Sequence, residues 1–181
     1  MEKRLQHIQK IAIVGPESTG KSTLTEALAS YYGEPFVAEA ARSYVANLDR
    51  PYQLHDIEAM AQMQLMAENK LLQNANQYLF CDTSLLVHKV WAQFVFNEVP
   101  ESIINAYQPN AYGLHLLCNI DIAWVADPLR EHPHHRQELF NIYEMELQQS
   151  GANYTIISGK HEHRCQSAIE AINNFHKSLK V

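Results

Sequence analysis

The chain has 181 residues, of which 46% are apolar, and its formal net charge at pH 7 is −6. This length and apolar content suffice for one domain with a sizeable core and leave no room for a second domain of ordinary size. The acidic balance excludes a general basic face that would neutralise a nucleic-acid backbone, so we expect no nucleic-acid partner. A small anionic ligand held by a few arginines is compatible with this charge.

Cysteine usage and hydropathy indicate where the protein works. Cys81, Cys118 and Cys165 are widely spaced and form no Cys-x-x-Cys pair, so we expect reduced thiols rather than disulfides. The first residues show no apolar segment behind their charges, and no apolar run approaches membrane-spanning length. We therefore expect a soluble, cytoplasmic protein with no membrane partner, while its oligomeric state is not predicted.

Residues 15–22 read Gly-Pro-Glu-Ser-Thr-Gly-Lys-Ser and match the phosphate-loop pattern G-x-x-x-x-G-K-[ST] in full. The pattern follows an apolar run and precedes a segment with helical spacing, which is the context that such a loop requires. Its glycines let backbone N–H groups point at a phosphate, and the following helix adds its dipole. We therefore expect an ATP site, with Lys21 on the β- and γ-phosphates and Ser22 on Mg²⁺. The expected nucleotide contacts are Gly15, Glu17, Ser18, Thr19, Gly20, Lys21, Ser22 and Thr23.

Apolar runs that read as strands alternate with segments of helical periodicity along the chain. The expected strands cover residues 11–14, 36–38, 78–82, 114–120 and 154–158, and the expected helices cover residues 23–32, 55–74, 85–96, 136–149 and 165–179. Residues 97–113 read as loop, helix, loop, and His161 and His163 fall in the turn before the last helix. This alternation predicts an α/β P-loop fold, a five-stranded parallel sheet with helices on both faces.

Two carboxylates follow the second and third expected strands, where open α/β sheets bind ligands. Asp82 is expected on the Mg²⁺ side of the nucleotide, with capping of a helix that begins at Thr83 as the alternative. Glu39 is expected to face the substrate hydroxyl that accepts the phosphoryl group. Its alternative is a solvated ion pair with Arg42, which would share one helical face with it.

Residues 123–136 form a polar stretch that contains two prolines, Arg130 and Arg136. Its three histidines, His132, His134 and His135, lack a supporting cysteine or carboxylate pattern, so a solvated loop is favoured over a metal site. We expect this stretch to be a mobile lid whose two arginines close on the phosphates during transfer.

The motifs also indicate which class of nucleotide-using protein this is. The N-K-x-D and D-x-x-G motifs of GTPases do not occur, and the chain is short for a transport-type or ring-forming ATPase. An acid after the second strand, an acid after the third and an arginine-bearing lid before the last helices are typical of a small kinase.

Four stretches, residues 15–22, 39–45, 79–83 and 124–130, resemble the ribosylnicotinamide kinase domain of NadR-type proteins. The first stretch is generic to P-loop proteins, the second and fourth are much more particular to this group, and the resemblance covers nearly the whole chain. It implies ATP-dependent phosphorylation of the ribose 5′-hydroxyl of nicotinamide riboside to nicotinamide mononucleotide, a step of NAD salvage. The adenylyltransferase segment of longer members, with its H-x-G-H motif, has no counterpart here, so we expect a stand-alone kinase domain over residues 1–181.

The residue pattern and the resemblance together assign roles. We expect Lys21, Glu39, Asp82, Arg130 and Arg136 to be catalytic, Glu39, Arg42, Tyr44, Asp82, Trp124 and Asp127 to bind substrate, and Ser22 and Asp82 to hold Mg²⁺. Two positions depart from the family pattern: Ser84 replaces a second Asp, and Pro128 replaces the Gly that usually follows Asp127. Trp91 and Phe94 are interpreted as core, and the residue that stacks on the substrate base stays open among Tyr44, Tyr52, Trp91 and Trp124.

Three functions are therefore compatible with the sequence. The favoured one is a nicotinamide riboside kinase, the second is a related P-loop kinase for another nucleoside or small alcohol, and the third is an ATP-binding regulatory module without useful turnover. Glu39 argues against the third, because a sensor needs no base directed at an acceptor hydroxyl.

Overall fold

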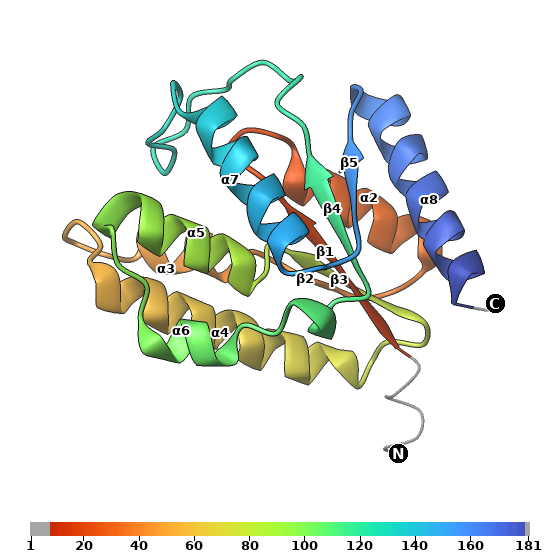
Figure 1. The fold of residues 1–181 in the computed structure, drawn as a ribbon, viewed down its shortest axis with the longest axis horizontal. Coiled ribbons are helices and arrows are strands. Elements are labelled where there is room, and N and C mark those ends of the chain that lie inside the picture. The colour runs from red at the N-terminus through yellow and green to blue at the C-terminus, as the bar shows by residue number, and fades with distance from the viewer. Residues whose placement is uncertain (1–7, 180–181) are drawn as a thin grey trace.

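A computed structural model describes residues 8–179, and its centre is a five-stranded sheet with the order β2-β3-β1-β4-β5 (Figure 1). All four strand pairs are parallel. The strands are β1 (Gln9–Val14), β2 (Phe36–Val37), β3 (Tyr78–Asp82), β4 (Leu114–Cys118) and β5 (Tyr154–Ile157). The parallel sheet predicted from the sequence is confirmed.

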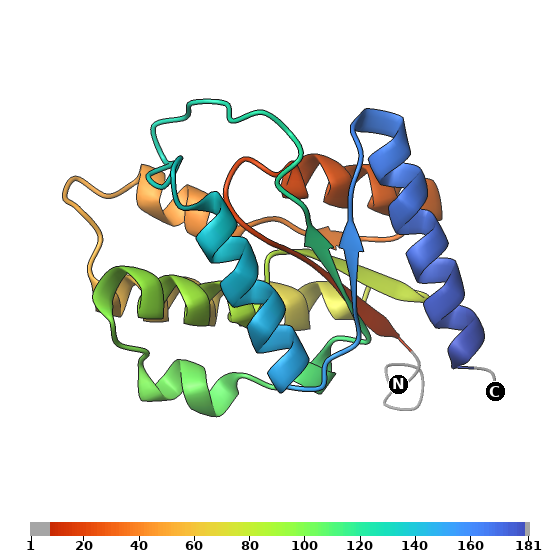
Figure 2. The same cartoon turned by 45° about the horizontal axis from the view of Figure 1, so that its top comes forward.

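Helices cover both faces of this sheet, as Figures 1 and 2 show. The helices are α2 (Lys21–Tyr32), α3 (Ala40–Ala46), α4 (Leu54–Leu72), α5 (Leu85–Phe96), α6 (Glu101–Ala106), α7 (Arg136–Gln149) and α8 (His161–Ser178), with a short 3₁₀ turn at Pro109–Ala111. Side chains of α2 and α8 cluster on one face, and side chains of α5 and α7 cluster on the other.

The central strand shows why both faces need a helical cover. Ile11 and Ile13 of β1 pack among residues of α2 and α8, while Ala12 and Val14 pack among residues of α5 and α7. Each of these four side chains is fully buried, because alternate residues of a strand point to opposite faces and both faces are covered. A further apolar cluster joins α3, α4, α5 and α6 beside the sheet.

The sheet topology brings the expected site residues to one edge. β1 lies between β3 and β4, so the strand order reverses direction at the point where the phosphate loop leaves β1. Because all strands are parallel, their carboxyl ends share that edge, where ligands bind in open α/β sheets. Figure 2 shows the loop of residues 119–135 arching over this edge between β4 and α7.

Two helix starts differ from the sequence-based expectation. α8 begins at His161, so His161 and His163 lie in its first turn and not in a connecting turn. The apolar periodicity begins only later in this helix, and a buried arginine, Arg164, occupies its first turns instead. α5 begins at Leu85 after Ser84, and its N-terminus has no side-chain cap, so Asp82 does not cap it.

The three cysteines are free thiols, and Cys81 and Cys118 are buried, as expected. Burial raises the pKa of both thiols. Among residues 8–179, no helix has both the length and the apolar character needed to cross a membrane.

Two buried histidines make the stability of the fold sensitive to pH. His88 of α5 and His115 of β4 are almost fully buried, and burial lowers the pKa of each to about 4. An exposed histidine in the unfolded chain titrates near 6.5. Between these values the unfolded chain binds protons that the folded chain does not, so stability is complete above pH 6.5 and is lost as the pH falls toward 4.

We predict that His115→Leu reduces this loss. Each of the two histidines contributes a slope approaching about 1.4 kcal/mol per pH unit to the unfolding free energy in this window. Asp82 acts in the opposite direction, because its pKa is raised to about 6 and the folded state takes up its proton first. Urea unfolding between about pH 7 and pH 4 should show a slope smaller by about one proton in the variant. The exposed His134→Leu control should keep the wild-type slope, and an unchanged slope in His115→Leu would contradict the assignment.

Candidate active site

A cavity of about 480 Å³ lies at the carboxyl edge of the sheet. It joins two regions, the phosphate loop on one side and a partly aromatic wall on the other. Its lining comprises residues 15–23, Glu26, Phe36, Ala38, Glu39, Ala41, Arg42, Val45, Tyr52, Asp82, Val87, Trp91, Phe94, residues 128–132, Leu139 and Tyr143. The cavity thus contains every residue of the expected phosphate loop.

The phosphate loop is wound tightly at its two glycines. Gly15 has φ 132°, and a Cβ added there would lie 2.9 Å from the backbone oxygen of Cys118 at the end of β4. Gly20 adopts a left-handed conformation at the N-cap of α2. The Thr19 hydroxyl and the Lys21 ammonium both donate to the carbonyl of Pro16, at 2.8 and 3.0 Å. The close approach therefore requires glycine at position 15, the left-handed backbone favours it at position 20, and both Thr19 and Lys21 bond the Pro16 carbonyl.

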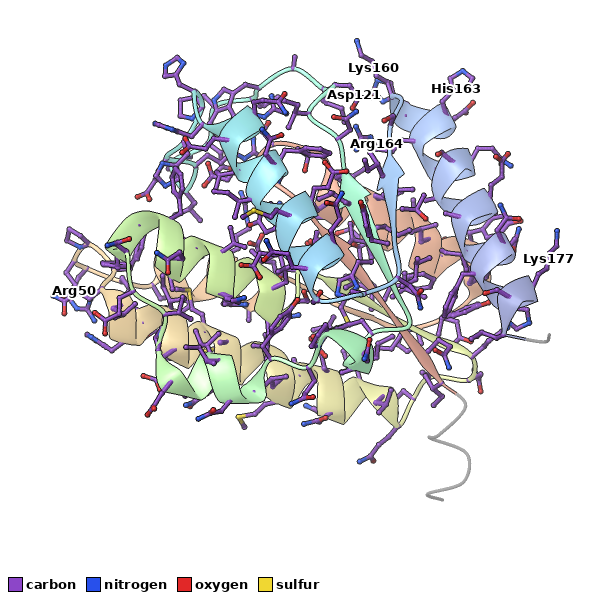
Figure 3. All side chains as sticks on the ribbon, in the orientation of Figure 1. Arg50, Asp121, Lys160, His163, Arg164 and Lys177 are labelled. Atoms are coloured by element: carbon purple, nitrogen blue, oxygen red, sulfur yellow. The ribbon has the colours of Figure 1, made fainter. Side chains whose placement is uncertain are left out.

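A buried arginine supports this loop from below. Arg164 is 3% exposed and donates to the backbone oxygens of Thr19 at 3.1 Å, Asn119 at 3.2 Å and Gly159 at 2.9 Å. Its guanidinium also bonds the Asp121 carboxylate, and Figure 3 shows these two residues near the upper ends of β4 and α8. This role was not predicted, because the three carbonyls that Arg164 bonds come from separate segments of the chain.

Asp82 ends β3 opposite Ile13 and is 3% exposed. Burial raises its pKa to about 6, the charges of Glu39 and Glu26 add to this, and Lys21 and the Ser22 hydroxyl oppose it. Its Oδ1 atom is buried without a hydrogen-bond partner. An unpartnered carboxylate oxygen beside a serine of the phosphate loop suits a hard divalent cation, so these residues fit Mg²⁺.

Within residues 8–179 no group of three or more His, Cys, Asp or Glu residues could hold a metal ion by itself. A magnesium site of the kinase type needs no such group, because water and substrate phosphates complete its octahedral shell. Ser22 and Asp82 would therefore suffice as the protein's own ligands to such an ion.

Glu39 is the N-cap residue of α3 and lines the cavity. It forms no hydrogen bond or ion pair with Arg42, whose guanidinium instead meets Asp127 at 2.5 Å. The negative charge of Glu39 contributes to the raised pKa values of Asp82 and Tyr143, which line the same cavity. The ion pair proposed as the alternative for Glu39 is not formed, and its carboxylate faces the cavity.

The two expected lid arginines occupy different surroundings. Arg130 lines the cavity, and its Nη1 donates to the Val125 carbonyl at 2.5 Å and to Ser18 Oγ at 3.4 Å. Arg136 does not line it, because its guanidinium donates to the backbone oxygens of Ile122 and Ser18 at 3.0 Å. Burial and the nearby arginines lower the pKa of Arg136. Arg130 therefore belongs to the cavity lining, whereas Arg136 joins the 119–135 loop to the phosphate loop through the Ile122 and Ser18 carbonyls.

Three residues expected to bind substrate lie outside the cavity lining: Tyr44, Trp124 and Asp127. The Tyr44 hydroxyl donates to Asp56 at 2.8 Å, and Arg50 donates to the same carboxylate, whose pKa lies below its usual range chiefly because of Arg50. Tyr44 thus ties α3 to α4. The Trp124 ring lies under the Arg136 guanidinium at 5.9 Å.

Three aromatic residues line the cavity without having been assigned to the site. Trp91 and Phe94 were interpreted as core, with Trp91 also left open as a stacking residue, and Tyr143 was not singled out. Trp91 donates from Nε1 to the Tyr52 hydroxyl at 3.1 Å, and Tyr52 donates to Glu131 at 2.6 Å. Helical spacing marks such residues as inward-facing but does not distinguish a core from a cavity wall.

Comparisons with known proteins agree with this geometry. Over 130 residues the chain is 28% identical to the trifunctional NAD biosynthesis/regulator protein NadR of Salmonella typhimurium. The aligned region covers 68% of this chain and 31% of that protein. A crystal structure of NadR protein in complex with NR matches with a TM-score of 0.78 and 23% identity, over 95% of this chain and 52% of that chain. Thymidylate kinase from Ehrlichia chaffeensis matches with a TM-score of 0.63 and 11% identity, over 92% and 97% of the two chains.

The chain spans less than a third of the curated NadR relative and about half of the NadR chain of known structure. The resemblance to NadR-type proteins and the P-loop fold of nucleoside and nucleotide kinases, both expected from the sequence, are confirmed. A family model described as an AAA domain matches residues 10–164. Because this match covers most of the sequence, the chain belongs to this AAA domain family.

Proposed function

We propose that the protein is an ATP-dependent kinase that phosphorylates the ribose 5′-hydroxyl of nicotinamide riboside and yields nicotinamide mononucleotide. One observation carries this proposal: a single cavity joins the phosphate loop to the unpaired carboxylate of Glu39. The fold shared with nucleoside kinases supports the kinase class, and the likeness to NadR supports the choice of riboside.

The nucleotide half of the cavity would hold the phosphates of ATP. Backbone N–H groups of the loop and the positive end of α2 would surround them, and Lys21 would exchange its bond to Pro16 for the β- and γ-phosphates. Ser22 and Asp82 would hold Mg²⁺, which when bound neutralises charge on the phosphates.

The acceptor half would supply proton transfer and orientation. The 5′-oxygen of the riboside attacks the γ-phosphorus, the bond from that phosphorus to the bridging oxygen breaks, and ADP leaves. Glu39 orients the hydroxyl and accepts its proton. Arg130 stabilises the charge of the phosphoryl group during transfer, because its guanidinium lies at the rim of the same cavity.

The charge of the acceptor half supports a cationic substrate. Glu39 and Glu131 line this half together with Tyr52, Trp91 and Phe94, while the charge of Arg42 is offset by Asp127. Nicotinamide riboside carries a positive pyridinium ring, which both carboxylates and aromatic faces attract. A neutral nucleoside would lack this attraction.

We predict that Lys21→Ala abolishes phosphoryl transfer and leaves the fold intact. The lysine charge would lie between the β- and γ-phosphates, where such electrostatic interactions often stabilise the transition state by about 3–4 kcal/mol. Steady-state turnover and circular dichroism measure the two effects. Near-wild-type turnover in this variant would remove the basis of the proposal.

Glu39→Gln should lower kcat with nicotinamide riboside by about 10²–10⁴-fold, because the amide cannot accept the proton. ATP affinity, measured by calorimetry, should be nearly preserved. An equal loss of ATP binding would reassign Glu39 to the metal site, and unchanged turnover would exclude it as the base.

A further prediction concerns the charge of the riboside that accepts the phosphoryl group. Reduced nicotinamide riboside has nearly the same shape but a neutral ring, so its kcat/KM should be lower by roughly tenfold, as expected for the loss of a cation–π and charge attraction. Increasing salt should narrow the difference. Equal kcat/KM values for the two ribosides would contradict the proposed attraction between the pyridinium ring and the carboxylates of Glu39 and Glu131.

A further inference from the structure

The side chain of Glu17, the third residue of the phosphate loop, points to the 119–135 loop. Its Oε2 atom accepts hydrogen bonds from the backbone N–H groups of Glu131 and His132, both at 3.1 Å, and its Oε1 lies 3.4 Å from the first of these nitrogens. We infer that Glu17 is a positioning residue that ties the phosphate loop to residues 131–132 and thereby sets the place of Arg130.

The charge of Glu17 fits this role better than nucleotide binding. A carboxylate repels a triphosphate, and the phosphate-loop pattern leaves this position free, so an acid is not needed there for phosphate binding. Both carboxylate oxygens of Glu17 point to backbone N–H groups of the 119–135 loop, those of Glu131 and His132. Bonds from N–H groups to an ionised carboxylate are stronger than bonds to a neutral acceptor.

The neighbouring residue holds a different part of the same loop. Ser18 Oγ accepts from the Val125 N–H at 2.9 Å, and the Ser18 carbonyl accepts from Arg136 at 3.0 Å. These contacts hold residue 125 of the loop and Arg136, the first residue of α7. Only Glu17, among the phosphate-loop residues, bonds the backbone directly after Arg130.

Glu131 is also bonded to Tyr52, which lines the aromatic side of the cavity together with Trp91. The Glu131 carboxylate accepts from the Tyr52 hydroxyl at 2.6 Å, and that hydroxyl accepts from Trp91 Nε1 at 3.1 Å. The backbone of residues 131–132 is therefore bonded to Glu17 of the phosphate loop, and the side chain of Glu131 is bonded to Tyr52 on the aromatic side of the cavity. Glu17 couples the two halves of the cavity, an inference whose catalytic part rests on the proposed kinase function.

The first test needs no substrate. Trypsin cleaves after arginine, so the rate of cutting at the Arg130–Glu131 bond, followed by mass spectrometry of the ligand-free full chain, reports release of this segment. Loss of hydrogen bonds to a charged acceptor should raise that rate by about tenfold in Glu17→Ala. Glu170→Ala, an exposed acid on α8 away from the cavity, is the matched control and should cleave at the wild-type rate.

Glu17→Gln keeps the size and one acceptor oxygen but loses the charge, so its cleavage rate should lie between those of wild type and Glu17→Ala. This variant also decides the question if Glu17→Ala does not fold, as judged by circular dichroism. A wild-type cleavage rate in the folded Glu17 variants would overturn the inference.

The second test uses kinetics with nicotinamide riboside and ATP. The positioning role predicts a kcat lower by about tenfold in Glu17→Ala, partial recovery in Glu17→Gln, and ATP affinity that is unchanged or higher because a negative charge near the phosphates is lost. Weaker ATP binding with unchanged kcat would make Glu17 a nucleotide ligand and overturn the inference. If the wild-type chain phosphorylates no riboside, the proposed function fails, while the cleavage test still decides the role of Glu17.

Discussion

The close approach between the phosphate loop and the end of β4 is the constraint on which the site depends. The chain turns sharply as it leaves the central strand and passes so close to the Cys118 carbonyl that a Cβ would not fit at position 15, where only glycine is accommodated. Arg164 fixes the other side of the turn by bonding the Thr19 carbonyl. These two contacts hold the loop between the end of β4 and the start of α2, where Lys21 and Ser22 line the cavity.

Two carboxylates in this cavity are suited to different tasks by their surroundings. Asp82 is buried, its pKa is raised to about 6, and one of its oxygens has no partner, so a nearby cation would favour its charged form. Glu39 is partly exposed at the start of a helix and forms no salt bridge with Arg42, whose guanidinium is paired with Asp127. One cavity therefore holds a buried and a partly exposed carboxylate, and such a difference in surroundings is what allows two acids to take different roles in the proposed reaction.

Polar contacts connect the 119–135 loop to the phosphate loop, while Ile120 packs against the core and His132 and His135 contact the Phe94 ring. Ser18 holds residue 125, Glu17 and Tyr52 hold residues 131–132, and Arg136, which follows the loop, bonds the Ser18 carbonyl. Segments held mainly by hydrogen bonds near solvent open more easily than core helices. The same contacts keep Arg130 at the cavity rim.

The sequence by itself determined the strands, most of the helices, the phosphate loop and the placement of Glu39 and Asp82 at strand ends, because periodicity and the loop pattern are local properties. It could not determine which partner each polar side chain meets. Tyr44 follows Glu39 by little more than one helical turn, yet Asp56 of α4 binds its hydroxyl. Arg136 turns inward to two carbonyls, and Trp91 and Tyr143 form a cavity wall where helical spacing indicates only burial. These outcomes depend on contacts between segments far apart in the chain, which only the packing of the helices on the sheet decides.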